Sequence, residues 1–60
     1  MGKWTCTATY TVDAGELRRT RQTQITAGRI LSDRTIERRL RDADPTAHLE
    51  RTEWVRDDRR

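Results

Sequence analysis

The sequence has little of what small proteins use to reinforce a minor core. It has one cysteine, one histidine, one proline and no phenylalanine among sixty residues. The lone Cys6 excludes a disulfide within one chain, and Cys6 with His48 cannot supply the four ligands of a structural zinc site. A chain this short buries only about 60% of the surface that its unfolded state exposes. We therefore predict no metal or other cofactor, and we expect a homo-oligomer that adds buried area.

Catalytic motifs are also missing. The three glycines are isolated, so the sequence contains no glycine-rich loop that could hold a phosphate. Cys6 and His48 could in principle form a nucleophile and base pair. A reactive thiol needs partly exposed, electropositive surroundings, whereas Cys6 falls on an apolar stripe. We predict a protein that is not an enzyme, with a reactive thiol or an intermolecular disulfide as the alternatives for Cys6.

Long apolar runs are absent as well. No segment has the apolar length of a secretory signal or of a membrane span. A myristoylation signal starting at Gly2 requires Ser or Thr where this chain has Cys6. We therefore expect a cytoplasmic protein without membrane association.

Charge, by contrast, is abundant. Thirteen basic residues face ten acidic ones, which gives a net charge of +3, and twelve of the thirteen are arginine. The guanidinium group binds both phosphates and carboxylates. The codons of a GC-rich genome would favour arginine in the same way. A net charge this small does not by itself identify a nucleic-acid-binding protein.

The clearest structural pattern covers residues 3–12, KWTCTATYTV. Apolar residues alternate there with a row of threonines, which comprises Thr5, Thr7, Thr9 and Thr11. A period of two with β-branched and aromatic residues predicts a strand that has one face on a core. The threonine face should be open to solvent or lightly covered.

A turn around Gly15 and a second strand over residues 17–25 should follow. A loop of Ala14 and Gly15 would pair Val12 with Leu17 and Trp4 with Ile25, which keeps the apolar residues on one face. In this register Arg19 and Arg21 lie opposite Tyr10 and Ala8. Such charged side chains fit only an edge strand, with their stems on the sheet and their heads in water.

One helix is predicted between Ser32 and Asp44. Ser32 is a good N-cap, and Pro45 forces the helix to end just before it. Ile36, Leu40 and Ala43 define its apolar face. Ile30 and Leu31 should cover the bottom of the same core.

The last segment permits two readings. Asp44-Pro45 could open a second helix, but residues 48–56 also fit a strand, and we prefer the strand because a lone hairpin is marginal in water. The predicted fold class is α+β: a β-β-α-β domain over residues 1–56 with a polar tail at 57–60. Its three-stranded antiparallel sheet has the order 2-1-3, and the helix packs on the face that carries Trp4 and Tyr10.

Arginines form the strongest candidate site. The helix places three of them opposite its apolar face, and the second strand carries three more; these are Arg34, Arg38, Arg41, Arg18, Arg19 and Arg21. Such a set could lie along the phosphates of DNA or RNA. The alternative is a solvated helix face that Glu37 partly neutralises. A non-catalytic nucleic-acid-associated module is the leading hypothesis.

The segment Ser32 to Leu40, SDRTIERRL, resembles the recognition helix of bacterial helix-turn-helix regulators. A serine cap, a Thr-Ile pair and a basic outer face recur in that helix, so the resemblance implies contact with DNA. The sequence departs from the motif before this point. Residues 25–30 are too few for the helix that should come first.

The rival hypothesis is a protein-interaction module. A strand edge or the face of Thr5, Thr7, Thr9 and Thr11 could pair or stack with another protein or with a second copy. The protein would then be a small accessory or inhibitor protein, of the kind that mobile elements encode, that acts as a dimer.

Overall fold

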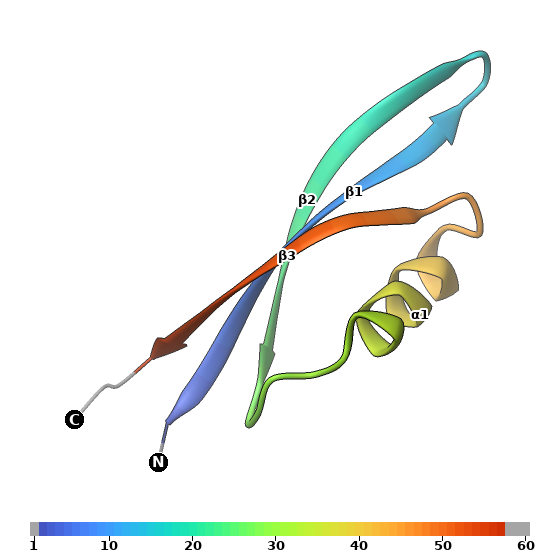
Figure 1. Ribbon diagram of the computed structural model, residues 1–60. Coiled ribbons are helices and arrows are strands. Elements are labelled where there is room, and N and C mark those ends of the chain that lie inside the picture. Colours follow the sequence, from blue (N-terminus) through green and yellow to red (C-terminus); the bar gives the residue numbers. More distant parts are fainter. Residues whose placement is uncertain (1, 58–60) are drawn as a thin grey trace.

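The computed structural model describes residues 2–57 and confirms the predicted α+β architecture (Figure 1). Strands β1 (Lys3–Ala14) and β2 (Leu17–Ala27) form a hairpin, which helix α1 (Asp33–Ala43) and strand β3 (His48–Asp57) follow. β1 pairs antiparallel with both other strands, so the sheet order is β2-β1-β3. The most apolar strand is therefore the central one, and β2 is an edge as predicted.

The hairpin turn lies further along the chain than predicted. Ala14 pairs with Leu17, so the two-residue loop consists of Gly15 and Glu16. Gly15 has a φ of 68°, and no described residue other than a glycine has a positive φ. This is the geometry of the hairpin turn that has glycine at its first central position.

The pairing of the hairpin changes accordingly. Arg19 lies opposite Val12 and Arg21 lies opposite Tyr10, so the prediction of Tyr10 and Ala8 as their partners was wrong. The shift amounts to two residues, and side chains alternate with a period of two. Every side chain of the hairpin therefore keeps its predicted face, and both arginines lie on the face that the helix occupies.

Strand β3 contains a bulge. Thr9 pairs with Arg51 whereas Tyr10 pairs with Leu49, which leaves Glu50 as the extra residue. The extra residue reverses the alternation, so Leu49 and Trp54 both pack against the core despite their opposite parity. The bulge therefore interrupts the period of two within β3. Residues 58–60 of the predicted tail lie outside the described residues.

Local signals fix the ends of α1. The Ser32 hydroxyl accepts a hydrogen bond from the backbone N–H of Thr35 at 3.3 Å, as an N-cap does. At the other end the N–H of Asp44 donates to the carbonyl of Leu40 at 2.9 Å. Both boundaries confirm the prediction. Because β2 precedes α1, the resemblance to the helix-turn-helix motif does not extend beyond this one helix.

The core is small. Its buried residues come from β1, α1 and the loop before β3, and they are Cys6, Ala8, Val12, Ile36, Leu40 and Ala47. Leu31 packs against this cluster as expected. Ile30 is 54% exposed, so the prediction that it covers the core was wrong. Ala43, at the end of the predicted apolar face, is also exposed.

The helix covers only part of the sheet. In the upper half of Figure 1, α1 lies beside β3, and β2 lies on the far side of β1. Thr52 of β3 donates a hydrogen bond to the carboxylate of Asp33 at 3.2 Å, which holds the helix on this side. An eleven-residue helix is about 16 Å long, whereas a twelve-residue strand spans about 40 Å. In β2 every residue is exposed or half-buried. Within residues 2–57, no helix has the length and apolar character to cross a membrane.

Candidate functional site: a groove between α1 and β2

The uncovered part of the sheet forms a groove beside the helix. Its volume is about 410 Å³. Its lining residues come from β1, β2, α1 and the C-cap of α1, and they are Tyr10, Val12, Arg21, Ile25, Arg39, Leu40, Ala43 and Asp44. The groove exists because α1 lies nearer β3 than β2. Its volume falls within the range of about 300–1,000 Å³ that is typical of ligand sites.

The floor of the groove is apolar and aromatic. Tyr10 and Val12 alternate along β1 on the helix side of the sheet, and Ile25 of β2 lies on the same side opposite Cys6. Tyr10 and Ile25 are half-buried, because they pack against the core without being covered by the helix. The groove therefore offers a ligand both an aromatic ring and aliphatic surface.

Two arginines from different elements border this floor. Arg21 lies on β2 opposite Tyr10, and Arg39 lies on α1 next to the buried Leu40. Both side chains are exposed, and neither forms an ion pair with another described residue. Of this pair the sequence identified Arg21 as a site residue. Arg39 was not among the predicted site residues, although its position next to the apolar Leu40 was the available signal.

Asp44 is the acidic residue of the groove, and its carboxylate is already bound within the chain. One carboxylate oxygen accepts the hydroxyl of Thr46 at 2.7 Å and the backbone N–H of Thr46 at 2.9 Å. These two bonds, first the hydroxyl and then the N–H, lower the pKa of Asp44, and the positive charge of Arg21 lowers it further. Asp44 is therefore ionised at neutral pH, and its one negative charge offsets one of the two arginine charges of the groove.

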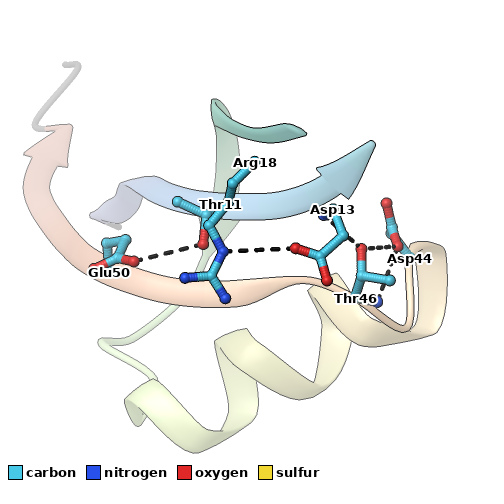
Figure 2. Close-up of polar contacts among 6 residues, drawn as sticks. All are labelled: Thr11, Asp13, Arg18, Asp44, Thr46 and Glu50. Carbon is cyan, nitrogen blue, oxygen red and sulfur yellow. Dashed lines mark hydrogen bonds and ion pairs between the residues drawn. The ribbon is translucent and has the colours of Figure 1, made fainter. Parts of the chain in front are cut away.

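Thr46 also joins this loop to the central strand (Figure 2). Its hydroxyl oxygen accepts a hydrogen bond from the N–H of Asp13 at 3.0 Å. The carboxylate of Asp13 forms an ion pair with Arg18 at 3.5 Å, and Thr11 donates to Glu50 at 3.5 Å. The predicted site residue Arg18 is thus engaged within the chain, on the face opposite the groove.

The face of α1 that carries the three predicted arginines is exposed, but its charge is mixed. Arg34, Arg38 and Arg41 line a shallow hollow of about 520 Å³ together with Glu37 and Asp42. Arg41 forms an ion pair with Glu37 at 2.6 Å and donates to the carbonyl of Ala47 at 3.3 Å. The six predicted arginines therefore do not form one patch.

The threonine row lies on the opposite face of the sheet. Thr5, Thr7, Thr9 and Thr11 are half-buried, and α1 packs on the other side. Apart from the exposed Val55 opposite Thr5, the residues that pair with the row are polar, and Gln22 of β2 donates to the hydroxyl of Thr9 at 3.2 Å. This face offers hydrogen-bonding groups and little apolar surface.

The structure does not bring Cys6 and His48 together. Cys6 is completely buried on the helix side, whereas His48 is exposed and pairs with Thr11. Burial raises the pKa of the Cys6 thiol. Within residues 2–57, no three His, Cys, Asp or Glu side chains are grouped so that they could hold a metal ion.

No protein-family model, curated protein or solved structure matches this chain. A fold of this size hosts many unrelated functions, so function must follow from the chemistry of a site. The groove is the site at which exposed arginines meet a concave apolar surface.

Proposed function

We propose that this protein is a non-catalytic nucleic-acid-binding module whose contact surface is the groove side of the molecule. The supporting observation is that Arg21 and Arg39 approach the groove from different elements without an ion-pair partner among the described residues. A guanidinium group that is not held in an ion pair can bind a phosphate through two parallel hydrogen bonds.

The remaining arginines divide into two groups. Arg19 lies next to Arg21 along the same face of β2, and Arg34 and Arg38 are exposed on α1 without an ion pair to a described residue. Arg19 extends the basic surface of the groove along β2, whereas Arg34 and Arg38 lie in the separate hollow that also contains Glu37 and Asp42. Arg18 and Arg41 contribute less, because internal ion pairs already bind them. A cytoplasmic location is part of this proposal, since it offers nucleic acid and keeps thiols such as Cys6 reduced.

A protein-interaction module has weaker support. Arg19 and Arg21 carry charge on the inner face of the edge strand β2, and the other edge strand contains the bulge at Glu50. Inward-pointing charges and bulges are features that hinder pairing between sheet edges. The threonine face stays the candidate surface for a protein partner, and a homo-oligomer stays a prediction that sedimentation velocity would test.

Fluorescence anisotropy with labelled DNA and RNA oligonucleotides tests the proposal. We expect binding at low salt that weakens as salt rises, because binding releases the counterions of the phosphates. The double variant Arg21→Ala, Arg39→Ala should bind more weakly, and the slope of log affinity against log salt should become shallower by about 2.

The matched control is Arg18→Ala, Arg51→Ala. This control also removes two positive charges, but from the threonine face, where Arg51 lies opposite Thr9 and Arg18 lies opposite Asp13. We expect the control to bind nearly as well as the parent, with both variants folded by circular dichroism. Absence of binding to any nucleic acid at low salt would refute the proposal, and equal losses in the two variants would refute the assignment to the groove.

A further inference from the structure

The groove has properties that a surface for duplex phosphates does not need. Phosphates require cationic groups at a surface, but the floor of this groove consists of Tyr10 with Val12 and Ile25. An aromatic ring that is half-buried beside aliphatic groups suits a flat apolar ligand. The floor and the rim of the groove thus fit two different parts of one ligand.

The ligand class follows from combining these parts. A nucleotide has a flat base, which stacks on aromatic side chains, and an anionic phosphate, which binds arginine. Arg21 comes from β2 and Arg39 from α1, and Tyr10, which pairs with Arg21, lines the same groove. The volume of about 410 Å³ fits one small ligand unit rather than a helix of nucleic acid.

We propose that the groove binds one unpaired nucleotide of a single-stranded nucleic acid, with its base on Tyr10 and its flanking phosphates on Arg21 and Arg39. This inference rests on the proposed function and narrows it. The bases of a duplex are paired and stacked, so their faces cannot reach the floor of a groove, whereas single strands expose them. Stacking on Tyr10 makes the recognition tolerant of sequence, because every base has a flat face.

Anisotropy titrations with a single-stranded oligonucleotide and with its duplex, at one salt concentration, test the inference. We expect the single strand to bind about tenfold more tightly. Tyr10→Leu should weaken binding of the single strand by about tenfold and leave the affinity for the duplex unchanged. Tyr10→Phe keeps the aromatic ring and should therefore retain the affinity for the single strand. Thermal unfolding followed by circular dichroism shows whether each variant is folded.

A second measurement avoids substitutions altogether. In NMR titrations of the parent protein with a short oligothymidylate, the Nε–H signals of Arg21 and Arg39 and the ring protons of Tyr10 should shift, and those of Arg18 should not. Equal affinity for duplex and single strand would overturn the inference and leave the proposed function intact. Shifts confined to Arg34 and Arg38 would overturn both the inference and the assignment of nucleic-acid binding to the groove. Absence of any nucleic-acid binding would overturn both the inference and the proposed function. Tighter binding of polyglutamate than of oligothymidylate in the groove would indicate an acidic protein partner and would also overturn both.

Discussion

The two edge strands flank the same central strand, yet they differ in what lies above them. Helix α1 contacts β3, and the half-buried Leu49 and Trp54 of that strand pack against the core, whereas Ile25 is the β2 residue that does so. The connection between α1 and β3 is short, so the end of the helix must lie near the start of β3. Thr46, which binds both Asp44 and the N–H of Asp13, holds that connection against β1.

The difference shows how a very small domain can form a concave site. A helix of eleven residues cannot cover a sheet whose strands are about twice as long in space. The core forms where α1 packs on the side of β1 and β3, and the side toward β2 stays an open groove with two arginines. The core and the candidate site thus lie on one face of one sheet, and substitutions on the two sides should have different effects.

The largest contrast should come from truncating one isoleucine on each side. Ile36 is fully buried, so Ile36→Ala should lower the free energy of unfolding by about 2–5 kcal/mol. Ile25 is half-buried on the groove floor, and Ile25→Ala should cost about 1 kcal/mol. Urea denaturation followed by tryptophan fluorescence measures both. Equal losses would mean that β2 contributes as much to the core as the helix side does.

A smaller effect is expected at the hairpin turn, which holds β2 to β1. Gly15 has a φ of 68°, and Gly15→Ala should lower the free energy of unfolding by about 1 kcal/mol because other residues rarely adopt this conformation. Gly28→Ala is the matched control, since its added Cβ would meet nothing within 4 Å and its φ is not positive. If the two variants unfold at the same urea concentration, the turn assignment is wrong.

Alkaline pH should lower the free energy of unfolding by a smaller amount, through the Cys6 thiol that is buried under the helix. Burial raises the pKa of Cys6 above its ordinary value of 9.0, so the folded state holds the thiol proton more tightly than the unfolded chain does. This contribution to stability is complete below pH 9.0 and is lost as pH rises through the folded-state pKa. Urea denaturation across this range should show falling stability, and Cys6→Ala should remove that slope. A thiol reagent should also label Cys6 about a hundredfold more slowly in the folded protein than in urea.

The smallest effect is expected at the loop that positions α1. The hydrogen bonds from Thr46 lower the pKa of Asp44 below its ordinary value of 3.8. The carboxylate therefore stabilises the fold above pH 3.8, and this contribution is lost as pH falls through the lower folded-state pKa. Thr46→Val should weaken the acid dependence of unfolding, and Asp44→Asn should abolish the part due to this group. An unchanged acid profile in Asp44→Asn would show that the carboxylate contributes nothing.

Local patterns in the sequence determined most of the fold. The alternation of residues 3–12 specified a strand with one apolar face, and the Ser32 cap and Pro45 specified where the helix begins and ends. These signals could be found because strand periodicity and cap chemistry involve residues that are contiguous in the chain. Choosing a strand for residues 48–56 then placed the most apolar strand in the centre of the sheet.

Only the tertiary structure decided the hairpin register, the bulge at Glu50 and the position of the helix over β3. A register shift of two residues leaves every side chain on the same face, so the apolar pattern could not distinguish the two pairings. The threonine alternation marked the central strand correctly, but it could not show that its apolar face is covered on one side only. The groove, with Arg21 and Arg39 together, depends on how elements distant in the sequence pack, and that packing is not encoded in any local pattern.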